Sequence, residues 1–519
     1  MKKDKRRERS EKAQRSQSKN LCALCVFFFA LFAFNSSFAN NIKIWNAKVV
    51  DPTHLAFDIS WENSWSLPAN RAPGNHDAVW VFIKYNQNNT FWKHLDLSLN
   101  ASDYTVSGST LSIDPGSDGK GIFIERTDTG TGNIDSTHLV VKWTDSLNIS
   151  AIYSFRVFGI EMVYVPQGGY FLGDGAANNV FSRGDVAAPF FINSENSIPV
   201  GSDSLSLLDT GLYAPVAAIP ANYPKGYNSF YCMKYEISQW QYISFLNCLD
   251  YHQQKARTIV SPASASGSFA FSSSNAARNG IVIASSGIDS TTPAIYACDA
   301  DNKSMFNDTN DGQDRACNFL GWADIAAYLD WAALRPMTEM EFEKICRGPA
   351  TPVKGEFAWG TAFATDGNTV TNNGTPEESV SEMPPAGYGL ARYYSLTGPL
   401  GPVRCGFAGS THTGRLPQGA AYYGVMEMSG NLWEDCITVD SMGLLFTGGN
   451  GDGNLSYTGD ANVPDWPGTN GIGAGYRGGA FESSIFSTYR DLAVSDRYYA
   501  GLAPNLRRNT SGGRGVRVK

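Results

Sequence analysis

The chain is poor in charge, in histidine and in long apolar runs. Charged residues make up 17% of its 519 residues, and only six residues are histidine. This composition argues against a disordered polyelectrolyte and against a long charged helix. The 52 glycines and the 13% of aromatic residues favour short strands, tight turns and aromatic packing. A chain of this length is expected to form roughly two to four domains.

Cysteine spacing gives no sign of a zinc site. Seven cysteines follow residue 39, none of them in a CxxC pair, and the histidines are scattered singly. An odd number leaves at least one thiol unpaired or intermolecular. We expect these cysteines to be buried small apolar residues or to form one or two structural disulfides whose pairing stays open. They are Cys232, Cys248, Cys298, Cys317, Cys346, Cys405 and Cys436.

The charge is distributed unevenly. Residues 1–39 hold nine Lys/Arg and three Asp/Glu, which is six net positive charges, so the rest of the chain carries −14 of the overall −8. Such an acidic surface repels phosphate backbones, and no nucleic-acid partner is expected.

The first 39 residues are typical of an export signal. A basic segment from Lys2 to Lys19 precedes an apolar stretch from Leu21 to Phe34, and Ser37-Phe38-Ala39 is a small-x-small cleavage site. The alternative is a membrane anchor, but the apolar stretch is shorter than the roughly twenty residues that span a bilayer. We expect a mature chain that begins near Asn40 and is periplasmic, on the cell surface or extracellular, with no transmembrane segment.

Residues 40–159 are predicted to form a β-sandwich. Six short alternating runs, separated by turn signals, have the spacing of sandwich strands. They are 42–45, 55–59, 79–83, 121–124, 139–143 and 153–157. Four tryptophans in this region, Trp61, Trp65, Trp80 and Trp92, are expected in the core, with a sugar-stacking platform as the alternative.

Residues 160–519 mix helical patterns with irregular sequence, which predicts an α+β domain poor in regular secondary structure. Ser238 caps one expected helix, and a second repeats Trp322, Ile325 and Leu329 on one face. Thr338 and Glu341 form the capping box of a third. The polar stretches 174–225 and 255–315 are predicted to be long surface loops.

Seven motifs in this second region fall in one order and together resemble the formylglycine-generating enzyme, or sulfatase-modifying factor, family. They are Met162–Pro166, Tyr235–Ser238, Arg335–Glu343, Phe357–Gly360, Tyr423–Glu434, Tyr476–Ala480 and Gly513–Arg517. The resemblance implies a C-type-lectin-like fold that is stabilised by calcium.

The Gly-Asn-Leu-Trp-Glu segment carries the expected calcium site. By resemblance, the side chains of Glu427 and Glu434 and the carbonyls of Gly430 and Leu432 are the ligands, and such hard oxygens suit Ca²⁺. The alternative is that Glu434 makes only a buried ion pair or hydrogen bonds. Two other oxygen-rich loops, 307–314 and 450–460, lack EF-hand spacing, and solvated loops are the favoured interpretation of both.

The chain lacks the residues for the oxidase chemistry of the family. Its oxygen-dependent members bind Cu(I) through two cysteines that follow an Arg-Gly-Gly-Ser motif. Here the serine position is Ala480, and the two cysteine positions are Ser483 and Thr488. A protonated hydroxyl cannot replace a soft thiolate. No copper is therefore expected.

Another branch of the superfamily uses this scaffold to bind ligands. In the corresponding C-terminal stretch the chain clusters residue types of recognition surfaces, namely Tyr489, Arg490, Arg497, Tyr498, Tyr499, Asn505, Arg507, Arg508 and Asn509. By resemblance, Trp433 matches an aromatic position that lines the family's site and is added to this surface, with a packed core position as the alternative. The alternative is that the aromatic rings are buried and the arginines pair with acids. The sequence predicts an exported, non-catalytic binding or structural module with a protein or glycan ligand. The alternative function is an oxidoreductase of this superfamily with a non-copper or rearranged site.

Overall fold

The computed structural model describes residues 41–519 except 89–90, 109, 148–150, 177–178, 210, 216, 273, 395–397, 410–413 and 486–489, together with the backbone of strand β1 (Asn35–Ser36). The predicted export signal otherwise lies outside the described residues. None of the helices in the described part of the chain combines the length and the apolar character needed to cross a membrane.

Residues 41–142 contribute most of a five-stranded antiparallel sheet. Its order is β1, β2 (Lys43–Asp51), β3 (His54–Ser66), β9 (Gly130–Lys142) and β6 (Thr105–Val106). β3 and β9 form its longest pairing, which runs from His54 opposite Lys142 to Ser66 opposite Gly130.

A second antiparallel sheet joins the two halves of the sequence. Its order is β25 (Val516–Arg517), β15 (Phe230–Met233), β10 (Tyr153–Val165), β4 (Asp77–Gln87), β8 (Ile122–Arg126) and β7 (Leu111–Pro115), and β5 (Trp92–His94) also pairs with β4. β10 runs across the expected domain boundary at residue 159 and pairs with β4 on one side and β15 on the other. The last strand of the chain therefore extends a sheet that begins in the N-terminal region.

β4 is apolar on both faces, which explains its unbroken run of apolar residues. Val79 and Val81 pack with Phe57 and Ile59 of β3 in one core between the two sheets. On the opposite face, Trp80 and Phe82 enter a second core with the helices. All six runs predicted as strands lie in or against strands of these two sheets.

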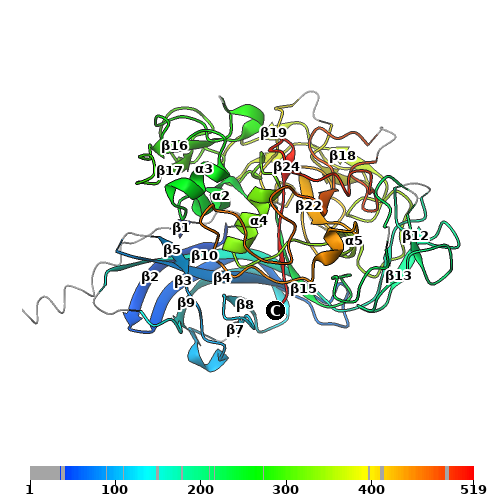
Figure 1. Cartoon of the computed structure of the whole chain (residues 1–519), viewed down its shortest axis with the longest axis horizontal. Helices are drawn as coiled ribbons and strands as arrows, with labels where there is room; N and C mark the ends of the chain where they lie inside the picture. The colour runs from blue at the N-terminus through cyan, green and yellow to red at the C-terminus, as the bar shows by residue number, and fades with distance from the viewer. Residues whose placement is uncertain are drawn as a thin grey trace, which may run out of the picture.

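Four α-helices occur in the described part of the chain. They are α2 (Gln239–Leu246), α3 (Tyr251–Arg257), α4 (Trp322–Trp331) and α5 (Glu339–Arg347). Figure 1 shows α2 and α4 above the N-terminal strands and α5 beside β22. The predicted caps are confirmed, because Ser238 and Thr338 each close a capping box with the third residue of the helix. Trp322, Ile325 and Leu329 are buried, as their spacing predicts.

The rest of the second region is built from small sheets and irregular connections, so the chain is a mixed α+β structure. A three-stranded sheet has the order β23 (Ala474–Arg477), β22 (Trp433–Ile437) and β24 (Ser511–Gly512). The two-stranded pairs are β11 (Tyr170–Leu172) with β13 (Phe190–Ile192), β12 (Ser182–Arg183) with β14 (Leu207–Leu208), β16 (Ile281–Ser285) with β17 (Ile295–Cys298), β18 (Ala364–Asp366) with β21 (Gly389–Ala391), and β19 (Val370–Thr371) with β20 (Ser379–Val380).

The stretches 174–225 and 255–315 differ from simple surface loops. Phe181, Ile219 and Ile283 are fully buried in the same core as α2 and α4. Widely spaced apolar anchors within a polar sequence hold these segments against the body of the protein.

Candidate functional site

A network of buried ion pairs surrounds α5. Glu341 accepts two hydrogen bonds from the guanidinium of Arg335, at 2.8 and 2.6 Å, and also accepts one from the backbone N–H of Thr338. Glu343 accepts hydrogen bonds from Arg347 at 2.9 Å and from Arg477 at 3.0 Å. These side chains are almost completely buried, so each charge depends on its partner.

Arg497 belongs to this network and not to an exposed surface. Its guanidinium donates to Glu339 at 2.6 and 2.9 Å and to Asp209, and it is 1% exposed. Arg477 donates to the same Glu339 at 2.9 Å. The prediction of a recognition surface therefore fails for Arg497, because the carboxylates of α5 and the 174–225 stretch bury it.

The Gly-Asn-Leu-Trp-Glu segment is held by hydrogen bonds from its own backbone and amide groups. Gly430 has a φ of +94°, and a Cβ there would lie 2.6 Å from the carbonyl oxygen of Arg392, so glycine is required. The Asn431 side chain donates to Glu236 and accepts from the N–H of Val403, and Glu236 also accepts from the N–H of Leu432. The segment thus connects two distant parts of the chain, at Glu236 and at Val403.

The two carboxylates of the expected calcium site differ in their hydrogen-bond partners. Glu434 is 1% exposed and accepts from the Nε and Nη2 atoms of Arg514 at 2.9 and 2.6 Å. Glu427 accepts from the N–H of Gly406 through Oε1, while Oε2 has no hydrogen-bond partner. Burial raises the pKa of Glu427 to about 7, although Arg514 opposes the shift.

The geometry is a partial match for calcium at this turn. The unpartnered Oε2 of Glu427 fits a missing cation. The Arg514 guanidinium on Glu434 does not, because a cation there would meet a second positive charge. Within the described residues, three acids converge closely in only one place, at Asp299, Asp301 and Asp311, which is a different part of the molecule.

By resemblance, Ala480 stands at the serine position of the copper-site motif, and Ser483 and Thr488 stand at its two cysteine positions. Ala480 is fully buried, and its backbone N–H donates to Oγ of Ser483 at 3.0 Å. The Ser483 hydroxyl also interacts with Asp491, whose pKa is raised by burial to about 6 even though this hydrogen bond opposes the shift. Thr488 lies outside the described residues.

All seven cysteines are buried, and none forms a disulfide in the structure. Burial raises the pKa of each thiol, as for Cys346 and Cys436. The Cys405 thiol donates to the carbonyl of Glu236 at 3.4 Å, and the Cys232 thiol donates to that of Met233 at 3.3 Å. A raised pKa disfavours the thiolate that metal binding requires.

The remaining residues of the predicted recognition surface differ in their contacts and in their exposure. Trp433 and Tyr499 meet edge to face with centroids 5.4 Å apart, and Tyr499 meets Tyr498 at 4.8 Å. Arg507 instead donates to both oxygens of Asp324 at 2.7 Å. Arg490 and Asn505 are exposed, whereas Tyr489 lies outside the described residues.

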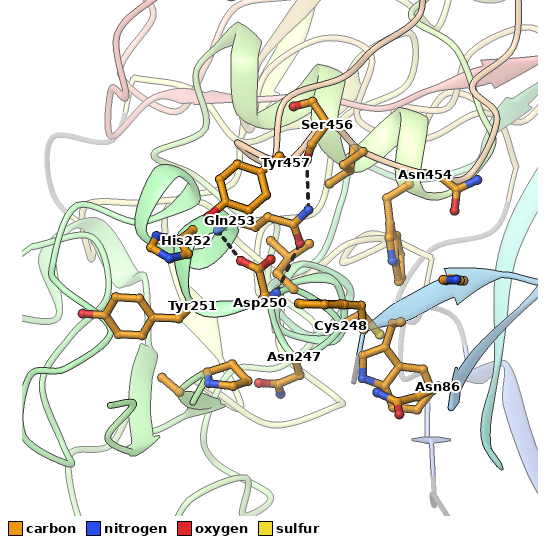
Figure 2. A pocket seen from close by; sticks show the side chains of 18 of the residues that line it. Asn86, Asn247, Cys248, Asp250, Tyr251, His252, Gln253, Asn454, Ser456 and Tyr457 are labelled. Atoms are coloured by element: carbon orange, nitrogen blue, oxygen red, sulfur yellow. Dashed lines mark hydrogen bonds between the residues drawn. The ribbon is translucent and has the colours of Figure 1, made fainter. Parts of the chain in front are cut away.

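A large cavity lies elsewhere, between the N-terminal strands and α3, and the sequence motifs did not reveal it. Its volume is about 900 Å³. Figure 2 shows Tyr457, His252 and Asp250 around it, with Gln253 bonded to Asp250 and to the carbonyl of Ser456. Polar side chains and aromatic rings share the lining, which includes Asn86, Phe91, Trp92, Asn247, Tyr457 and Asn454.

The four tryptophans of the N-terminal region differ in burial, and Trp65, like Trp92, is only half-buried. Trp61 and Trp80 are buried in the two cores, which confirms the core prediction for these two. Trp92 is half-buried and lines the cavity, with the guanidinium of Arg156 4.2 Å from its ring centroid. The exposed side chains of Phe91 and Tyr457 belong to the same lining.

Comparison with known proteins places these features in a family. The helix α5 with its buried ion pairs, the Gly-Asn-Leu-Trp-Glu turn and the small sheets belong to a mixed α+β domain. The model of the sulfatase-modifying factor enzyme 1-like domain matches residues 161–491, and the chain belongs to this family.

Two further comparisons complete the result. No curated protein matches the chain. Among 23 matching chains of solved structures, one comes from a study of "pH-induced modulation of Streptococcus parasanguinis adhesion by Fap1 fimbriae". It is 14% identical, covers 31% of this chain and 78% of its own length, and has a TM-score of 0.13.

Proposed function

We propose that this protein is an exported, non-catalytic member of the sulfatase-modifying factor family that acts as a binding or structural module of the cell envelope or the extracellular space. The residue types at the serine position, Ala480, and at the first cysteine position, Ser483, support the loss of copper oxidation. Ala480 has no donor atom, and the Ser483 hydroxyl is a hard donor that already interacts with Asp491. Cu(I) prefers soft thiolates.

The cavity beside α3 is the observation that supports binding most directly. Its volume of about 900 Å³ is in the range of small-ligand sites. Trp92 and Tyr457 offer ring faces, while Asn86, Asn247 and Asn454 bring amide groups to the same lining. Ring faces stack on the C–H faces of sugars, and amides bond their hydroxyls. We therefore assign a short oligosaccharide to this cavity.

Titration of the mature chain with a panel of soluble oligosaccharides tests the assignment. Trp92→Ala is expected to weaken binding about tenfold or more, because one stacking face is lost. Trp65→Ala is the matched control, since Trp65 is also half-buried but does not line the cavity. Equal affinity in the Trp92 variant, or binding of peptides alone, would contradict the assignment.

The alternative oxidoreductase function has one observation in its favour. Asp491 is a partly buried acid with a raised pKa beside Ser483, and perturbed acids of this kind occur at active sites. This alternative requires oxygen consumption that depends on Asp491. An unchanged rate of oxygen uptake in Asp491→Asn would count against it.

Calcium at the Gly-Asn-Leu-Trp-Glu turn and export remain parts of the proposal. The unpartnered oxygen of Glu427 supports a cation there, the carbonyls of Gly430 and Leu432 are ligands by the family resemblance, and Glu434 would share its carboxylate with Arg514. Export predicts a mature N-terminus near Asn40 in the envelope or culture fraction. Mass spectrometry of the N-terminal peptide measures it, and a retained basic N-terminus would favour the membrane anchor.

A further inference from the structure

An acidic loop between β17 and α4 brings three aspartates together. Asp299 directly follows the last residue of β17, and Asp301 and Asp311 lie further along the same connection. One carboxylate oxygen from each lies within 4.8 Å of those of the other two. None of the three belongs to the family motifs or to the cavity beside α3.

The charges of this cluster are only partly neutralised by the residues that the structure describes. Asp299 accepts backbone N–H groups from Lys303 and Ser304, at 3.0 and 3.2 Å. Asp301 pairs with the ammonium of Lys303 at 2.5 Å, but that lysine side chain is 64% exposed. A single exposed lysine therefore faces three carboxylates.

Asp311 is the side chain that points to a missing partner. It is 0% exposed, and its Oδ2 accepts a hydrogen bond from the N–H of Asp308 at 2.9 Å. Its Oδ1 is buried and has no hydrogen-bond partner. Burial and the charges of Asp308 and Asp299 raise its pKa to about 6, although the amides of Asp308 and Asp301 oppose the shift. A buried carboxylate in this state is costly unless a cation compensates it.

We propose that the Asp299–Asp311 loop is a calcium site, in which Asp299, Asp301 and Asp311 each provide a carboxylate oxygen. The donor set contains no sulfur and no imidazole, which favours a hard cation over zinc or copper. The ammonium of Lys303 competes with the calcium ion for Asp301, and it moves to solvent when the ion binds. The site does not depend on the proposed binding function or on copper chemistry.

Calorimetric titration of the chelator-treated mature chain with CaCl₂ tests the proposal, together with the melting temperature in EDTA and in Ca²⁺. Asp311→Asn keeps the shape of the side chain and is expected to weaken calcium binding about tenfold or more at this site. Lys303→Gln is expected to strengthen it roughly fivefold, because the competing charge is removed. In EDTA, Asp311→Asn should melt no lower than the unmodified chain, which establishes that this variant folds.

Glu427→Gln separates this site from the turn that the family resemblance predicts. The proposal requires that Glu427→Gln keeps the loop-site binding event that Asp311→Asn loses. Three outcomes would overturn it: no calcium binding by the unmodified chain, identical titrations for Asp311→Asn and the unmodified chain, or calcium binding that Glu427→Gln abolishes and Asp311→Asn leaves intact.

Discussion

The helix α5 and the Asp299–Asp311 loop both bury carboxylates, but they balance them differently. Each glutamate of α5 faces one or two guanidinium groups at hydrogen-bond distance, and both partners are buried. In the loop, three aspartates face one exposed lysine. The buried acids of α5 have matched arginines and stabilise the fold, whereas the loop carboxylates lack such partners, which is the observation behind the proposed calcium site.

The same distinction applies within the family motifs. Glu434 is matched by Arg514, while Glu427, seven residues earlier, keeps one unpartnered oxygen. The Glu434–Arg514 pair therefore stabilises the fold, whereas Glu427 keeps an oxygen that a ligand could use.

Removing one charge from the α5 network should have the largest effect. Glu339→Gln leaves Arg477 and Arg497 without their shared carboxylate, and breaking a buried pair costs about 3–5 kcal/mol. Urea unfolding measures the loss. The control is Asp96→Asn in the partly exposed pair with Lys120, where about 1 kcal/mol or less is expected. Equal losses in the two variants would contradict the distinction between matched burial and surface pairing.

The stability of the protein should depend on pH through Glu427. Its pKa rises from 4.5 to about 7 on folding, so the folded state holds the extra proton between these values. The contribution is fully present below pH 4.5 and is lost as the pH rises through 7, by up to about 3 kcal/mol. The unfolding free energies of the unmodified chain and of Glu427→Gln are measured in EDTA from pH 4.5 to 7.5. Because glutamine resembles the protonated side chain, the two curves should converge near pH 4.5 and differ near pH 7.5. Parallel curves would show that Glu427 does not titrate in this range.

The smallest signal is expected when a thiol reagent is added to the folded protein. Because all seven are buried with raised pKa values, a thiol reagent should label fewer than one cysteine per folded chain and all seven after unfolding. Rapid labelling of two of these seven thiols in the folded mature chain would contradict their burial.

Local signals in the sequence predicted local structure well. The caps at Ser238 and Thr338, the buried stripe of α4 and the six strand runs depend on residues close together in the chain, and the structure contains them. The family was likewise recognisable from ordered motifs and is confirmed by the match over residues 161–491.

Contacts between residues that are far apart in the sequence could not be predicted from local patterns. No local pattern indicates that β10 continues past residue 159 to pair with β15, or that β25 joins the same sheet. Arg497 has the composition of a binding residue, and only the fold brings Glu339 and Asp209 to it. Asp311 was part of a loop interpreted as solvated, because sequence does not reveal that a side chain within a polar stretch is buried.

The central claim is that this chain keeps the scaffold of a copper oxidase family without the thiol pair that binds the metal. Anaerobic Cu(I) titration, followed by oxygen uptake with a cysteine-containing peptide, tests it most directly, with Ser483→Cys/Thr488→Cys as the comparison. The account predicts no stoichiometric Cu(I) binding and no peptide-dependent oxygen uptake by the unmodified chain, and a gain of one bound Cu(I) in the double variant. One tightly bound Cu(I) per unmodified chain, with oxygen consumed in proportion to the peptide thiol, would contradict it.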